Sequence, residues 1–330
     1  MLRRLAAFVL AFAAVLIAVV SISFAGLNRW ARGKTLKELA ENPAAHRLVQ
    51  AIGFKSLVAN RHPACTWREA WTLAGLSRNV TFDAIGGSLR IVRTDGSLSL
   101  VRTPYGELWM PTRDIGAAPE LFLDQQDEIY QPPGQGVRPG DTVLDCGANI
   151  GVYTKFALSK GAARVVAIDL SPEVIECLRR NFTREIAAGS VTIYPKGVWD
   201  TETSLELNAP DEMSSMASTV SADLKRGRPA GVSVPVTTID KLVDELSLTR
   251  VDFIKMDIEG AEAHALLGAR STLERFKPRL AIALEHRPDD PDTLPQLIAA
   301  QWPFYRTSLS RCSIRGVAHI QPYVMYAHSK

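Results

Sequence analysis

Short apolar runs alternate, from residue 142 onward, with segments whose apolar residues recur at helical spacing. The apolar runs predict strands at residues 142–146, 164–170, 191–194, 251–257, 279–285, 304–308 and 322–327. Between them the spacing predicts helices at residues 151–158, 172–187, 239–246 and 260–275. Strands that alternate with helices are typical of a parallel sheet with crossover helices on its faces. The pattern therefore predicts an α/β fold with a doubly wound, mostly parallel seven-stranded sheet.

The preceding part of the chain has a different pattern. Residues 35–76 carry apolar residues at mixed helical spacing, which predicts short helices. Residues 79–112 show short alternating runs, which predict hairpins, and these runs are interrupted at Gly86-Gly87, Asp95-Gly96 and Tyr105-Gly106. The dipeptide Asp95-Gly96 favours a tight turn. Further on, residues 208–231 are rich in Ser, Ala, Pro and charge, and they predict a long loop.

The N-terminal segment contains an uncharged apolar stretch at residues 5–27, flanked by basic residues on both sides. As a helix, this stretch spans a hydrocarbon core of about 30 Å, so it predicts a single transmembrane anchor. A cleaved signal peptide and a buried core helix remain as alternatives; Ser23 and Ala25 have the small side chains that a cleavage site before Gly26 needs. The slight excess of positive charge after the stretch favours a cytoplasmic body.

These patterns divide the chain into three parts. Residues 1–30 contain the anchor with its flanks, residues 31–112 form a small α+β accessory region, and residues 113–330 form an α/β domain. The composition, 46% hydrophobic and 22% charged, is that of a globular protein. The net charge of +3 comes from basic residues spread along the chain, which argues against a nucleic-acid partner. The four cysteines are far apart and form no C-x-x-C pair, which argues against a zinc site and a disulfide framework and favours a reducing compartment.

The clearest chemical motif follows the strand at residues 142–146. Here Asp145 is followed by a glycine-rich turn that opens a helix, with Gly147, Asn149 and Gly151 in a Gly-x-Asn-x-Gly arrangement. In α/β sheets this position binds nucleotide-like ligands. Glycine and asparagine tolerate the positive φ of a tight turn, and Asp145 suits a ligand that carries positive charge. The same residues could alternatively form a purely structural turn.

A second carboxylate, Asp169, ends the next predicted strand and can accept hydrogen bonds from both hydroxyls of a ribose. Its alternative role is to cap the helix that begins near Pro172, for which Ser171 competes. Together with the turn, Asp169 indicates an adenosine ligand with a cationic tail, which is S-adenosylmethionine. A nicotinamide cofactor would require Gly-x-Gly-x-x-Gly, and the turn lacks that pattern.

These motifs resemble the class I S-adenosylmethionine-dependent methyltransferases, and within them the FkbM family. The resemblance is carried by residues 143–154, 238–240 and 251–262, the last of which reads Val-Asp-Phe-Ile-Lys-Met-Asp-Ile-Glu-Gly-Ala-Glu. It implies a Rossmann-like domain that binds the donor through the turn and Asp169. It also implies an acidic residue near the acceptor at Glu285, and a further acidic position at Glu128 that contacts the donor.

The candidate catalytic residues end the fourth and fifth predicted strands: Asp257, Glu259, Glu285 and His286. Carboxylates and imidazoles at the carboxyl edge of such a sheet can orient or deprotonate an acceptor. Each also has a structural alternative, such as Glu259 favouring the dipole of the next helix. The chemistry needs no metal, although Asp257, Glu259 and Glu285 could supply oxygen ligands to a hard cation.

The family resemblance implies O-methylation of a hydroxyl on a small molecule, such as a sugar or a polyketide-like metabolite. The predicted anchor favours a lipid-linked glycan or another acceptor of the cell envelope. A non-catalytic, membrane-tethered binding protein on the same fold is the alternative, because a fold does not by itself imply activity. The sequence pattern carries no signal for the oligomeric state.

Overall fold

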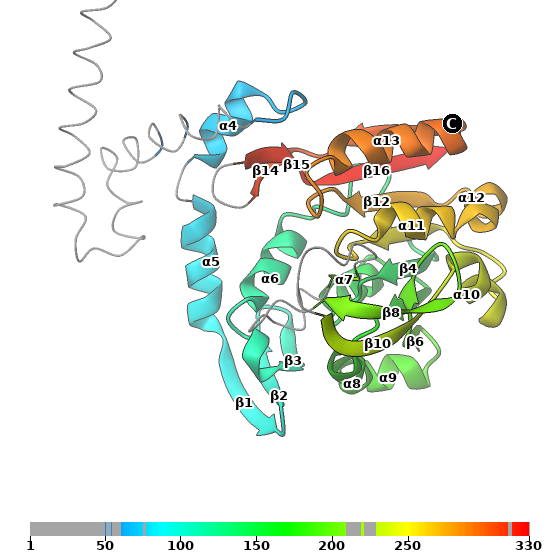
Figure 1. The fold of residues 1–330 in the computed structure, drawn as a ribbon. Coiled ribbons are helices and arrows are strands. Elements are labelled where there is room, and N and C mark those ends of the chain that lie inside the picture. Colours follow the sequence, from blue (N-terminus) through cyan, green and yellow to red (C-terminus); the bar gives the residue numbers. More distant parts are fainter. Residues whose placement is uncertain are drawn as a thin grey trace, which may run out of the picture.

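The computed structural model describes residues 50, 54, 61–74, 77–208, 219–220, 229–315 and 319–329. Its centre is a seven-stranded sheet with the strand order β13-β16-β12-β11-β4-β5-β6 (Figure 1). The pairs from β12 to β6 are parallel, whereas β16 runs antiparallel to both β12 and β13. This confirms the predicted mostly parallel sheet. Its strands are β4 (Thr142–Cys146), β5 (Arg164–Ile168), β6 (Val191–Tyr194), β11 (Phe253–Met256), β12 (Arg279–Ala283), β13 (Tyr305–Leu309) and β16 (Val324–Ser329).

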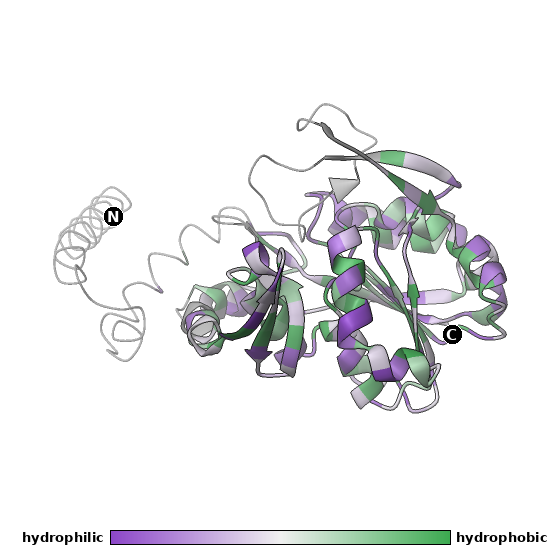
Figure 2. Cartoon of the chain, turned by 90° about the horizontal axis from the view of Figure 1, so that it is seen from below, coloured by the Kyte–Doolittle hydropathy of each residue, from purple (hydrophilic) through white to green (hydrophobic). Residues whose placement is uncertain are grey.

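Helices cover both faces of this sheet because successive strand residues point to opposite sides. In β4, Val143 packs in the apolar cluster beneath α7, and Leu144 packs in the cluster beneath α10 to α13. Figure 2 shows hydrophilic and hydrophobic residues on different sides of these helices. The helices are α7 (Val152–Ser159), α8 (Pro172–Asn181), α9 (Thr183–Ala187), α10 (Ile239–Glu245), α11 (Glu262–Leu267), α12 (Arg270–Phe276) and α13 (Asp290–Gln301).

The accessory region consists of a helical part and a three-stranded antiparallel sheet in the order β1-β2-β3. The turn predicted at Asp95-Gly96 joins β1 (Arg90–Asp95) to β2 (Leu98–Thr103), with Gly96 at φ 60°. The strand β3 (Gly106–Pro111) follows the predicted turn at Tyr105-Gly106. The hairpin prediction is wrong for its first ten residues, because α5 (Ser77–Ser88) is helical through Gly86-Gly87.

Three shorter elements, α4, η1 and α6, link or extend these units. The helix α4 (Trp67–Leu73) begins at Thr66, whose side chain accepts a hydrogen bond from the backbone N–H of Glu69. It is a short helix of the kind predicted for residues 35–76, most of which lie outside the described residues. After the hairpins come the 3-10 turn η1 (Thr112–Asp114) and α6 (Ala118–Gln126). The sequence pattern did not predict α6, which packs beside α5 and α7.

The region predicted as one long loop at 208–231 borders a second, four-stranded sheet in the order β7-β10-β8-β9. Its strands are β7 (Gly197–Val198), β8 (Thr203–Asn208), β9 (Thr219–Val220) and β10 (Pro229–Thr237). The loop prediction is therefore wrong at residues 208, 219–220 and 229–231, which belong to strands. The intervening residues lie outside the described ranges.

A disulfide joins Cys65 to Cys312, which are 247 positions apart in the sequence. It ties the start of α4 to the hairpin of β14 (Cys312–Arg315) and β15 (His319–Pro322). The expectation of no disulfide is wrong, because spacing along the chain says nothing about two cysteines whose Cα atoms lie 5.8 Å apart in the fold. Cys146 and Cys177 are free and buried.

The predicted anchor at residues 5–27 lies outside the described residues. Within the described ranges, no helix is long and apolar enough to cross a membrane.

Candidate active site

A cavity of about 270 Å³ lies at the carboxyl ends of β4, β5, β11 and β12. The helix α6 lines it from the side of the accessory region, and Tyr323 lines it from the end of β15. Six carboxylates and two lysines of the described residues line the cavity: Glu120, Asp124, Asp169, Asp257, Glu259, Glu285, Lys196 and Lys255. This excess of acidic groups suits a ligand with a positive charge.

The glycine-rich turn between β4 and α7 forms one wall of the cavity. Gly147 adopts φ 77°, and a Cβ atom there would lie 1.8 Å from the carbonyl oxygen of Asp257, so only glycine fits. Asn149 also has a positive φ, and its side-chain oxygen accepts a hydrogen bond from the N–H of Ile150 at 2.6 Å. Gly147 and Asn149 both line the cavity, as expected for ligand-binding residues.

Gly151 has a different function from the one predicted by the motif. It adopts φ 90° at the start of α7, and a Cβ atom there would lie 2.1 Å from the ring of Phe182. Gly151 does not line the cavity. Because Gly151 has no side chain, α7 and α8 can pack closely. Gly151 therefore helps to position the turn, although it does not itself line the cavity.

Asp169 lies at the end of β5 and lines the cavity. One carboxylate oxygen accepts the backbone N–H of Asn149 at 3.0 Å, and the other accepts that of Ser171 at 3.0 Å. Burial raises the pKa of Asp169, and these two N–H groups oppose that rise. Each oxygen keeps a lone pair for a further hydrogen bond, so the carboxylate is rigidly held and can still bind a ribose diol.

Asp145 lies directly behind the cavity wall and is fully buried. Its carboxylate accepts a hydrogen bond from the Thr154 hydroxyl at 2.6 Å and lies 3.4 Å from the ammonium of Lys255. Burial raises the pKa of Asp145, although Lys255 opposes this. Lys255 lines the cavity and donates a hydrogen bond to the carbonyl of Gly147 at 2.8 Å. The structure therefore connects Asp145 to the ligand space through Lys255.

Glu128 is a third predicted donor-binding residue that does not line the cavity, after Gly151 and Asp145. Its side chain is half exposed and forms an ion pair with Lys160 at 2.8 Å. Instead, the acidic residues on this side come from α6, with Glu120 and Asp124 in the lining. Sequence reasoning missed them because it did not predict α6. Pro119 at the start of the helix followed by an acidic first turn is the signal that could have identified it.

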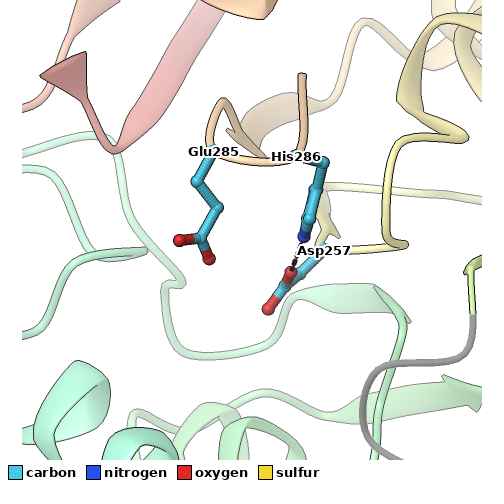
Figure 3. Close-up of side chains that lie close together, drawn as sticks. All are labelled: Asp257, Glu285 and His286. Atoms are coloured by element: carbon cyan, nitrogen blue, oxygen red, sulfur yellow. Dashed lines mark ion pairs between the residues drawn. The ribbon is translucent and has the colours of Figure 1, made fainter. Parts of the chain in front are cut away.

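The candidate catalytic residues lie after the ends of β11 and β12, and Figure 3 shows three of them, Asp257, Glu285 and His286. Asp257, Glu259 and Glu285 line the cavity, whereas His286 is buried beside them. The Nε2 atom of His286 lies 3.4 Å from Asp257 and 3.7 Å from Glu259. On the other ring edge, Nδ1 lies 2.9 Å from Glu262. The imidazole is therefore surrounded by three carboxylates.

This arrangement gives the two neighbouring carboxylates different proton affinities. Burial would raise the pKa of Asp257, but Lys255 and His286 outweigh burial and hold that pKa well below its usual range. Burial raises the pKa of Glu259 to about 7, with His286 opposing the rise. For His286, burial favours the neutral ring, yet Glu262 and Asp257 raise its pKa well above the usual value. The surrounding carboxylates thus favour the imidazolium form of His286.

Asp257, Glu285 and His286 also have ligand atoms within 4.8 Å of one another, a spacing that a divalent cation could share. This set differs from the sequence-based set, which has Glu259 in place of His286. The imidazolium and Lys255 already place two positive charges against Asp257. Two positive charges beside Asp257 oppose the binding of a further cation at this carboxylate.

Sequence reasoning quoted Glu262 within the motif but gave it no role. Its side chain is 1% exposed, and it accepts the backbone N–H of Ile258 at 3.0 Å as well as contacting His286. A fully buried carboxylate rarely occurs without partners. The signal that could have identified Glu262 is an acidic residue at the start of a helix, five positions after Asp257 and followed by the buried Ala265 and Leu266.

The parallel sheet, the glycine-rich turn and the carboxylate after the second strand define a class I methyltransferase-like fold. A family model, the methyltransferase FkbM domain, matches residues 145–312, about half of the chain. The chain belongs to this family, which confirms the resemblance seen in the sequence. S-adenosylmethionine is accordingly the cofactor of the domain. The residues present fit it, because Asp169 suits its ribose and the acidic lining suits its positive charge.

Similar proteins include AmbE, an antimetabolite synthetase of Pseudomonas aeruginosa, at 28% identity over 45% of this chain and 8% of AmbE. The ribosomal protein L11 methyltransferase of Burkholderia orbicola is 28% identical over 38% of this chain and 41% of its own. The chain thus spans less than half of the length of these relatives. Among solved structures, methyltransferase FkbM from Methylobacillus flagellatus is 20% identical, with a TM-score of 0.44, over 77% of this chain and 59% of that chain.

Proposed function

We propose that the protein transfers the methyl group of S-adenosylmethionine to a hydroxyl group of its acceptor. The donor supplies a methyl group already activated by its positively charged sulfur. The chain must then hold the two reactants in line, exclude water and remove the hydroxyl proton. Gly147, Asn149 and Asp169 hold the donor, and the acidic end of the cavity, with Glu259 and Glu285, receives the acceptor.

The position and the raised pKa of Glu259 are the observations that support this proposal. Glu259 lines the cavity, and its pKa of about 7 lets it exist as a carboxylate and accept a proton near neutral pH. It also has a left-handed backbone conformation with φ 57°, which is strained for a residue with a side chain. His286 is a poor base because it is already protonated, and Asp257 binds a proton too weakly.

The variant Glu259→Gln tests this assignment. Without the carboxylate, methyl transfer from methyl-labelled donor to fractionated cell-envelope extract should fall by about 10² to 10⁴, whereas donor affinity changes little. The matched control is Glu107→Gln, an exposed ion-paired residue of β3 that should leave transfer unchanged. In the unaltered protein the rate should rise as the pH passes through about 7, since Glu259 must lose its proton first. Full activity of Glu259→Gln would remove it from this role.

We further propose that the acceptor is a sugar hydroxyl or a related hydroxyl of a lipid-linked glycan, and that residues 5–27 anchor the protein in the membrane. The length and apolar character of that stretch support the anchor. A membrane-bound enzyme meets lipid-linked substrates at the surface where it is tethered. The labelled product of the extract experiment identifies the acceptor. Donor binding without any labelled product would instead favour a non-catalytic binding protein.

A further inference from the structure

Glu262 is a buried carboxylate at the start of α11 that does not line the cavity. Its Oε1 atom accepts the backbone N–H of Ile258 at 3.0 Å and lies 2.9 Å from Nδ1 of His286. The second contact is an ion pair that lacks the alignment of a hydrogen bond. Glu262 therefore joins two parts of the site: the turn that carries Glu259, and the imidazole at the end of β12.

The imidazole of His286 faces charged groups from each element that packs against it. Asp257 and Glu259 approach Nε2 from the turn after β11, and Glu262 approaches Nδ1 from α11. Glu285 precedes His286 in the chain, and Arg287 and Asp290 follow it at the start of α13. Of these groups, Glu262 is the one that contacts the ring on the side away from the cavity.

We propose that Glu262 is a positioning residue for the proposed methyl transfer, on which this inference rests. Through Nδ1 it holds His286 as an imidazolium whose Nε2–H faces Asp257 and Glu259. This fixed positive charge keeps Asp257 ionised and leaves Glu259 as the carboxylate that takes the acceptor's proton. Glu262 itself touches neither the donor nor the acceptor.

The charge of Glu262 is essential to this role, because it favours the protonated ring of His286. A neutral ring would present either a lone pair or a less acidic N–H to Asp257 and Glu259. A carboxylate on one ring nitrogen fixes both the orientation and the protonation of the other. Loss of the imidazolium would raise the pKa of Glu259 above about 7, since His286 is the group that opposes its rise. The negative charge of Glu262 itself raises the pKa of Glu259, but by less than His286 lowers it, so the net shift is upward. Glu259 would then hold its proton at neutral pH.

The variant Glu262→Gln separates this role from simple support of the turn. Its amide oxygen can still accept the N–H of Ile258, but it carries no charge. Histidine-labelled NMR of the full chain in detergent should show that His286 loses its proton at a lower pH than in the unaltered protein. Calorimetry with S-adenosylhomocysteine should show donor-site affinity within about twofold, because Glu262 lies outside the cavity. The matched control is Glu274→Gln on the exposed side of α12.

Kinetics with methyl-labelled donor and envelope extract provide the second readout. For Glu262→Gln we expect the maximal rate at neutral pH to fall about tenfold or more, with the KM for the donor unchanged. The rising part of the pH profile should move to higher pH. His286→Gln should produce the same shift, and the double variant should be no worse than His286→Gln alone, because Glu262 acts through His286.

Two results would overturn the inference. One is an NMR titration of His286 that is unchanged in Glu262→Gln. The other is a double variant whose loss of rate is the product of the two single losses, which would show that Glu262 acts independently. If Glu262→Gln does not fold, the pH profile of His286→Gln decides, since an unshifted profile removes the imidazolium from the reaction. The NMR titration needs no turnover, so it tests the ion pair even if the proposed reaction is wrong.

Discussion

Asp169 shows how a carboxylate that is held by the backbone can still line a cavity. Its two oxygens accept backbone N–H groups from the turn after β4 and from the start of α8, so its orientation is set before any ligand binds. A preoriented acceptor loses little conformational freedom on binding. The rigid carboxylate also lines the cavity, where we propose that it accepts hydrogen bonds from the ribose of the donor.

We predict that Asp169→Ala weakens binding of S-adenosylhomocysteine by about tenfold or more. Hydrogen bonds to charged groups contribute roughly 1.5 to 3 kcal/mol each, and tenfold corresponds to about 1.4 kcal/mol. Isothermal titration calorimetry measures the affinity, and circular dichroism checks that the variant is folded. Glu185→Ala, on the exposed helix α9, serves as the control. An unchanged affinity in a folded Asp169→Ala would show that the ribose lies elsewhere.

At the same scale, most of the residues that the sequence motifs predicted for the site line the cavity, but some do not. Gly147, Asn149 and Asp169 reach the cavity as predicted, and so do Asp257, Glu259 and Glu285. Asp145 points into the protein instead, because the pleat of a strand sends alternate side chains to opposite faces and the motif does not show which face carries the ligand. The role of Glu262 depends on a contact between α11 and the residue after β12, which no local pattern reveals.

At the scale of elements, the strands of the central sheet were easier to predict than the helices around them. Each buried strand is a short apolar run, whereas α5 contains Gly86-Gly87 and α13 contains Pro295, residues that usually interrupt helices. Tertiary packing outweighs those local preferences, and α5 packs against α6. Because the sequence pattern did not predict α6, it also missed the acidic residues that this helix contributes to the cavity.

The disulfide between Cys65 and Cys312 is the clearest case of an element contact that the sequence could not show. It fixes the start of α4 against the β14–β15 hairpin, where the backbone N–H of Cys312 also donates to Glu69 at 3.1 Å. Because it closes a long loop, it restricts the unfolded chain strongly. The apolar contacts of α4 with the hairpin form a small cluster that includes Ala70 and Ile320.

We predict that the variant with both cysteines replaced by serine unfolds at lower urea concentration, with a loss of about 2 to 5 kcal/mol in the free energy of unfolding. Reductant should lower the stability of the unaltered protein in the same way and should not affect the variant. Alkylation of the denatured, unreduced protein should label Cys146 and Cys177 alone, as measured by intact mass. Labelling of all four cysteines would contradict the disulfide.

At the scale of the whole molecule, the disulfide changes the argument about the compartment. Its predicted absence favoured a reducing environment, and that support no longer holds, because structural disulfides form and persist in oxidising compartments. Placing the body in the cytoplasm then depends on the cytosolic origin of the donor and on the basic residues after the apolar stretch. The disulfide thus favours an oxidising compartment, whereas the donor and the basic residues favour the cytoplasm.

We predict that the full chain is an integral membrane protein whose residues 31–330 face the cytoplasm. Residues 5–27 are long enough to span the bilayer, and no charged residue in that stretch opposes insertion. The protein should therefore stay in the membrane pellet after carbonate extraction, whereas a variant lacking residues 1–30 should be soluble and should still bind S-adenosylhomocysteine. Protease added outside intact cells should leave the body uncut. Degradation of the body would show that it lies outside the cell, in agreement with the disulfide. If the full-length chain is soluble instead, residues 5–27 form a buried helix and not a membrane anchor.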